Sequence, residues 1–178
     1  DPEHSEHIDN ERVRQNIYWD CYQGYTTMED RGKEDNFSFS QIEMAYYSEH
    51  YSDYVINQNK RHEKARHPDR CKGVEEILKN KKTCPEESIY QLGTIDEHAS
   101  VETLIRVFDE FKKEFDERFG SNVHIIDWSL HMDESTPHIH ERHVFDATNR
   151  YGEIEPKQEA ALEELGFELP NPEKKRSK

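Results

Sequence analysis

The sequence predicts an α+β protein with a mainly antiparallel sheet and helices packed on it. Two segments rich in β-branched and aromatic residues, 123–131 and 138–145, flank a short turn-forming run, which is typical of an antiparallel hairpin. Residues 101–119 carry a long apolar stripe at helical spacing. Because such a stripe must be buried against another layer, we expect the helices to cover one face of the sheet.

The first half of the chain predicts one strand and one long helix. Residues 16–22 indicate a strand, and the charged residues 29–36 indicate a loop. Ser40 and Glu43 form a capping-box pattern, so a helix is expected from there to about Arg66, before a proline. We expect its apolar side chains to pack in the core rather than stack on bases: Tyr46, Tyr47, Tyr51, Tyr54 and Val55.

The second half predicts two helices and three strands. Residues 74–81 indicate a short helix, and 88–95 a strand. The amphipathic helix 101–119 is closed by Gly120, and the hairpin strands follow it. Pro156 is expected to open a last helix that Gly166 ends.

Composition limits the class of protein. The 178 residues suffice for one domain, and 32% hydrophobic against 35% charged residues predict a modest core. No apolar run approaches the roughly 18 residues of a membrane span, and no secretory signal is visible. Three cysteines without metal-ligand spacing favour a reducing cytoplasmic location.

We expect residues 1–170 to form a single domain. The polar, basic stretch 171–178 is expected to lead into a further C-terminal region. The chain starts with Asp1, and we expect both of its ends to be cut from a longer protein.

The run from His131 to His140 holds three histidines and two carboxylates. Side chains alternate along a strand, so His138 and His140 share a face, and strand pairing brings His131 to the same place. Three neutral imidazoles at one point would make an open metal site. A histidine is more often a surface residue, and the chain has eleven. Three of them bracketing an acidic turn at strand spacing favour a divalent metal.

The two strands also predict which neighbours share the metal face. Asp127 and Ser129 should lie on it with His131, and Arg142 with the other two histidines. Arg142 is then placed either to meet a phosphate or to form a salt bridge with Asp127. The opposite face is expected to be apolar and to meet the helices, through Ile126, Trp128 and Leu130. Glu141 and His143 should face that side and pair with each other or with the helix layer, or lie beyond the part that the helices cover.

The pattern His131-x-Asp133-Glu134-x-Thr136-Pro137-His138-x-His140 resembles the metal motif of the Mob/Pre family of plasmid mobilisation relaxases, in the HUH endonuclease class. The N-terminal segment 8–12 with Asn16 is similar to the family's Arg/Asn motif. The resemblance implies a relaxase-like sheet whose central strands carry the histidines. It implies Mn²⁺ or Mg²⁺ as the working metal, while nitrogen ligands also suit Zn²⁺ or Ni²⁺, which could occupy the site in a crystal.

The resemblance implies an enzyme that nicks one strand at a plasmid or mobile-element transfer origin by transesterification. His131, His138 and His140 would hold the metal, Glu134 and Arg142 would be catalytic, and Arg12 and Asn16 would contact DNA. The partner would be origin DNA, single-stranded or hairpin, with no membrane and no small-molecule cofactor. Two alternatives stay open: a metal- and single-stranded-DNA-binding module that does not cut, and a metal-dependent phosphodiester hydrolase.

The attacking group of such an enzyme is a histidine in a His-Asn-x-Arg motif or a tyrosine near the N-terminus. No His-Asn-x-Arg is present, so we expect the nucleophile to lie before residue 1. His4, His7, Tyr18, Tyr22 and Tyr25 are possible substitutes, although none of them matches the motif.

Charge gives a mixed indication about DNA. The net charge of −15 argues against a nucleic-acid partner, but residues 60–82 hold nine Lys/Arg against four acids. Affinity for DNA depends on the local phosphate-contacting surface more than on the total charge. We therefore predict phosphate contacts there, the alternative being a merely solvated face. The residues concerned are Lys60, Arg61, Lys64, Arg66, Arg70 and Lys72.

Overall fold

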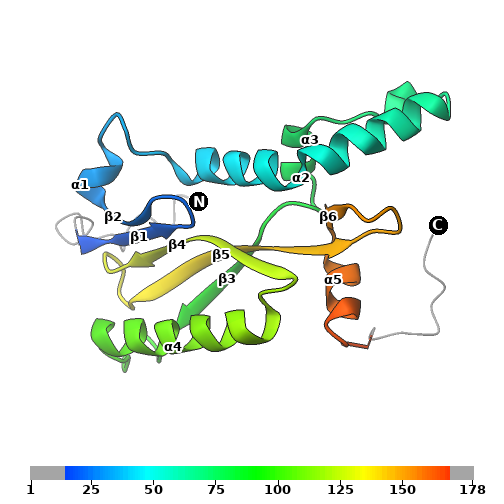
Figure 1. The fold of residues 1–178 in the computed structure, drawn as a ribbon. Coiled ribbons are helices and arrows are strands. Elements are labelled where there is room, and N and C mark those ends of the chain that lie inside the picture. Colours follow the sequence, from blue (N-terminus) through cyan, green and yellow to red (C-terminus); the bar gives the residue numbers. More distant parts are fainter. Residues whose placement is uncertain (1–14, 169–178) are drawn as a thin grey trace.

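An antiparallel sheet lies between helices in the computed structural model, which describes residues 15–168 (Figure 1). Five strands follow the order β2-β1-β4-β5-β3, β6 pairs with the end of β5, and every pairing is antiparallel. The predicted α+β class is confirmed. The strands are β1 (Ile17–Asp20), β2 (Gly24–Thr27), β3 (Glu86–Gln91), β4 (Val123–His131), β5 (His138–Thr148) and β6 (Ile154–Pro156).

The described helices include the long helix and the amphipathic helix that the sequence predicts. The amphipathic helix, α4, has the predicted bounds, because its Ser100 cap and its apolar stripe are both explicit in the sequence. The helical elements are α1 (Met28–Arg31), α2 (Phe39–Lys64), the 3₁₀ turn η3 (Pro68–Arg70), α3 (Val74–Leu78), α4 (Val101–Phe119) and α5 (Gln158–Glu164). Within the described residues, no helix is both long enough and apolar enough to cross a membrane.

The start of α2 differs from the prediction by two residues. The capping box is formed by Ser38 and Gln41, not by Ser40 and Glu43. Both pairs fit the sequence pattern, but Glu43 accepts a hydrogen bond from Arg142 of the sheet and therefore does not cap the helix. The other missed elements are short: α1 replaces part of the loop expected at 29–36, β2 precedes it, and β6 precedes the last helix.

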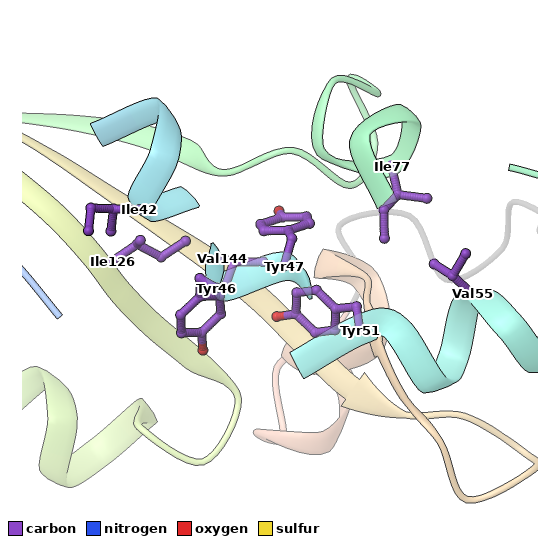
Figure 2. Close-up of a cluster of buried hydrophobic side chains, with 8 residues drawn as sticks. All are labelled: Ile42, Tyr46, Tyr47, Tyr51, Val55, Ile77, Ile126 and Val144. Atoms are coloured by element: carbon purple, nitrogen blue, oxygen red, sulfur yellow. The ribbon is translucent and has the colours of Figure 1, made fainter. Parts of the chain in front are cut away.

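The expectation that helices cover one face of the sheet is wrong, because α2 lies on one face and α4 on the other (Figure 1). The α2 side buries a cluster in which three tyrosines of α2 meet Ile126 and Val144 of the central strands (Figure 2). The α4 side buries Leu104 and Phe108 against Trp128, Leu130 and Ile139. Since the central strands carry apolar side chains on both faces, both faces need a cover.

A β-bulge between Ile125 and Asp127 explains one misplaced side chain. Strict alternation would place Ile126 with Trp128 on the α4 side. The bulge inserts one extra residue, so Ile126 instead joins the α2 cluster. Strand alternation is kept after the bulge, which leaves the predicted faces of Asp127, Ser129 and His131 unchanged.

Candidate functional site

Three cross-strand pairs line the α2 face of β4 and β5. The register places Asp127 opposite Arg142, Ser129 opposite His140 and His131 opposite His138. Directly opposed residues of an antiparallel pair point to the same face with Cβ atoms about 5 Å apart. The sheet therefore gathers six polar side chains, distributed over the two strands, on one surface.

The three histidine rings meet at the end of this surface. The ring centroids lie 5.3 Å apart for His131 and His138, 5.2 Å for His131 and His140, and 5.0 Å for His138 and His140. Among the described residues, no group of three or more His, Cys, Asp or Glu side chains is arranged to hold a metal ion as it stands. The rings have thus converged without adopting the geometry of coordination.

Hydrogen bonds fix the tautomers of two of these rings. His138 donates from Nδ1 to the backbone oxygen of Thr136 at 2.9 Å, and the Nδ1 of His140 lies 2.5 Å from a carboxylate oxygen of Glu87. Because these oxygens accept, Nδ1 of each ring carries a hydrogen, and the Nε2 of the corresponding neutral tautomer is the nitrogen with a lone pair. A second-shell acceptor of this kind is usual for metal-bound histidine. The sequence analysis missed Glu87, which lies 53 residues away on edge strand β3.

The environment of the third ring, His131, disfavours its charged form. Burial, followed by the two neighbouring imidazoles, lowers the pKa of His131, although Asp133 opposes the shift. Its Nε2 lies 3.0 Å from the Ser129 hydroxyl, and its Nδ1 lies 3.5 Å from Asp133. A cation would have to displace the hydroxyl from Nε2. Apart from that exchange, the donor set fits a divalent transition metal, since all three rings can present a neutral nitrogen.

Asn16 holds the turn that carries the acidic part of the motif. Its Oδ1 accepts from the backbone N–H of Met132 and its Nδ2 donates to Asp133, both at 2.8 Å. Asn16 is only 3% exposed, so in this structure its side chain supports the turn. It is not accessible for the DNA contact that was predicted. Arg12, predicted with it, lies outside the described residues.

Arg142 pairs with an acid that the sequence analysis did not consider. Its guanidinium donates to Glu43 of α2 at 2.5 Å, so the salt bridge to Asp127, one of the two alternatives, is not formed. The Arg142 side chain is 41% exposed, which leaves guanidinium nitrogens free for a phosphate. Asp127 is 1% exposed, and its Oδ2 is buried without a hydrogen-bond partner among the described residues.

A cavity of about 250 Å³ connects these groups. Its lining is mostly polar and comes from α2, β3, β4 and β5. The lining residues are Phe39, Glu87, Asp127, Ser129, His131, His140 and Arg142. Glu134 projects beside it from the turn, exposed and 4.0 Å from His138 Nε2. On the opposite face Glu141 pairs with His143 at 3.1 Å, as predicted.

The candidate tyrosines occupy different positions around the sheet. Tyr18 faces the same side as the histidines, since it pairs with Ser129 across β1 and β4. Its ring lies under the Arg31 guanidinium at 4.4 Å. Tyr22 donates to Glu49, and burial followed by this bond raises the pKa of its phenol. Tyr25 contacts Trp128 on the α4 side.

The basic residues are partly committed to ion pairs. Arg61 binds Glu153 through two hydrogen bonds of 2.8 and 2.7 Å. The remaining predicted DNA-contacting residues of this region are exposed on the end of α2, on η3 and just after it: Lys60, Lys64, Arg66, Arg70 and Lys72.

A family model described as plasmid recombination enzyme, Mob_Pre, matches residues 31–165. The chain belongs to this family. The match contains β4, β5 and the whole histidine cluster, and membership implies an enzyme that acts on DNA in plasmid recombination or mobilisation. No curated protein and no solved structure matches the chain.

Replacing Asn16 by Ala should lower the free energy of unfolding by about 1–3 kcal/mol, because the Met132 N–H and the Asp133 carboxylate would lose buried partners. Asn59→Ala is the matched control, because Asn59 makes the same two-bond clamp to the Lys72 backbone at an exposed position. Urea denaturation should show a smaller loss for the control. Equal losses would mean that burial of the Asn16 hydrogen bonds adds nothing to their contribution to stability.

Proposed function

We propose that this Mob_Pre protein nicks one strand of DNA at a plasmid transfer origin by transesterification, with a divalent cation held by His131, His138 and His140. The observation that carries the proposal is the convergence of the three rings on a strand pair whose next positions hold Arg142 and Asp127. The proposal is supported by family membership over residues 31–165.

The imidazoles supply what such a cation needs. The Nδ1 partners of His138 and His140 select the tautomer whose Nε2 can bind a metal, and burial disfavours the charged form of His131. Mn²⁺ or Mg²⁺ is the expected ion by family, and it would act as a Lewis acid on an oxygen of the scissile phosphate.

Arg142 and Glu134 have complementary roles in this proposal. The half-exposed guanidinium of Arg142 donates to a phosphate oxygen while Glu43 holds its other side. Glu134, exposed beside His138, accepts a proton or orients a water molecule at the edge of the site.

DNA beyond the nick would run along α2. Glu43 touches the site through Arg142, and Lys60 lies 17 residues further along the same helix, about 26 Å away at 1.5 Å per residue. Beside this helical end is a groove of about 630 Å³ whose lining includes Arg61, Arg150 and Lys157. The exposed cations at the end of α2 would therefore contact phosphates several base pairs from the nick.

The full-length protein should convert supercoiled plasmid bearing its origin to open circles in the presence of Mn²⁺. His140→Ala should abolish this conversion, whereas His98→Ala, an exposed histidine between β3 and α4, should not change it. Binding of the origin without nicking would support the non-cleaving module. Turnover of bis-p-nitrophenyl phosphate without a covalent protein–DNA adduct would support the hydrolase. An adduct mapped to Tyr18 would overturn our expectation of a nucleophile before residue 1.

Metal affinity should depend on the second shell as well as on the rings. Glu87→Gln is expected to weaken Mn²⁺ binding by about 10–100-fold, because the amide is a poorer acceptor for His140 Nδ1–H. Isothermal titration of the protein with MnCl₂ measures this change. The matched control is Glu86→Gln, the neighbouring acid on β3, which bonds Gln158 instead of a histidine. Equal affinity for both variants would remove Glu87 from the metal shell.

Neutralising Lys60 and Lys64 together to Gln should weaken binding to all DNA sequences alike. The slope of log K against log salt should fall by up to about 1.8, because each lost phosphate contact contributes about 0.9. The control is the double change Arg106→Gln and Lys113→Gln, two exposed cations of α4 on the opposite side of the sheet. Fluorescence anisotropy at several salt concentrations measures the slopes. Identical slopes for the two double variants would show that the end of α2 is only a solvated face.

A further inference from the structure

Asp127 is a buried carboxyl group whose partner is missing. The side chain is 1% exposed, and its Oδ2 has no hydrogen-bond partner among the described residues. The adjacent cation does not supply one, because Arg142 gives its hydrogen bond to Glu43. A buried polar atom without a partner costs about 1–3 kcal/mol and needs a reason.

The position of Asp127 on the sheet provides such a reason. It borders the same cavity as His131, His140 and Arg142. On β4 it lies one side-chain repeat before Ser129, the residue opposite His140, which corresponds to about 7 Å along the strand. That interval leaves room for one phosphate group between the imidazoles and the carboxyl group.

The surroundings keep this carboxyl group protonated. Burial and the nearby Glu43 and Asp20 raise the pKa of Asp127 to about 8, although Arg142 and Arg31 oppose the shift. Asp127 is therefore mostly neutral at pH 7 and can donate a hydrogen. The charged or titratable groups around it are Glu43 of α2, Asp20 of β1, Arg142 of β5 and Arg31 of α1.

We propose that Asp127 is the general acid that protonates the 3′-oxygen leaving group when the strand is cut; this role rests on the proposed nicking function. A phenol or imidazole nucleophile forms a bond to phosphorus, and the bond from phosphorus to O3′ breaks. The bonding electron pair goes to O3′, which takes the carboxyl proton of Asp127, and Asp127 becomes a carboxylate. Any proton on the nucleophile passes to solvent. In the rejoining reaction the carboxylate takes the proton back from the 3′-hydroxyl.

The other acids of the cavity are less suited to this step. Glu43 is bound to the Arg142 guanidinium, and Glu87 accepts from His140. Both groups are therefore already engaged with a donor of the protein. Glu134 is exposed at the edge of the site, and the histidines lie between it and Arg142.

The test compares two substrates of the full-length protein that differ in one atom. One is an origin oligonucleotide with the natural 3′-oxygen at the nick, and the other carries a bridging 3′-sulfur. A thiolate leaves without a proton, because thiols are far more acidic than alcohols. Asp127→Asn should slow cleavage of the oxygen substrate by about 10²–10⁴-fold. Cleavage of the sulfur substrate should stay within a few-fold of the unchanged protein.

Glu87→Gln is the matched control, because it alters the site through His140 and should slow both substrates alike. Equal slowing of both substrates by Asp127→Asn, or no slowing of either, would overturn the role of Asp127. Absence of cleavage of either substrate by the unchanged protein would overturn the proposed function, and the role of Asp127 with it.

The pH dependence of the unchanged protein gives a second measurement that does not rely on folding of the variant. An acid must be protonated to act, so the rate on the oxygen substrate should fall as pH rises through about 8. The rate on the sulfur substrate should lack that fall. A fall of equal size and midpoint on both substrates would contradict proton donation to O3′.

Discussion

The register between β4 and β5 is the constraint on which the site depends. It brings the histidine before the turn opposite the first histidine after it, and it places the remaining polar side chains in opposed pairs. A slip of one residue would turn all of these groups toward the α4 core. The bulge at Ile125–Asp127 adjusts this arrangement once, so that Ile126 can pack under α2 while Asp127 still faces the cavity. Packing and chemistry therefore share one face of the sheet.

Side chains distant in sequence hold the motif in place. Glu43 reaches Arg142 from α2, Glu87 reaches His140 from β3, and Asn16 clamps the turn from the start of β1. Each contact orders a group that would otherwise be mobile, and ordering before the reaction is what gives positioned groups their effect. The elements around the hairpin thus act as a shell for it as well as a cover for its apolar residues.

The sequence was sufficient for the hairpin, the two main helices and the histidine face, because alternation and helical spacing are local patterns. It was not sufficient for the partners. Arg142 could be predicted to face the cavity, but its choice of Glu43 over Asp127 depends on how α2 crosses the sheet. Asn16 was placed with DNA because its residue type and position resemble a motif, whereas its burial follows from tertiary packing. The sequence around the bulge contains no glycine or proline that would indicate it, so the change of face at Ile126 could not be predicted.

The electrostatics of the cavity indicate an order of binding. Among the described residues, four acidic side chains lie around the rings and the cavity, namely Glu43, Glu87, Asp133 and Glu134. The guanidiniums near them are those of Arg142 and Arg31. An acidic site of this kind repels a DNA phosphate and attracts a cation. A divalent ion bound by three neutral imidazoles would bring two positive charges to this surface, because such ligands carry no negative charge to offset them. Metal binding should therefore precede productive DNA binding at the histidines. The exposed cations at the end of α2 lie far enough away to contact DNA in the absence of metal, because their distance exceeds the screening length of about 8 Å at physiological salt.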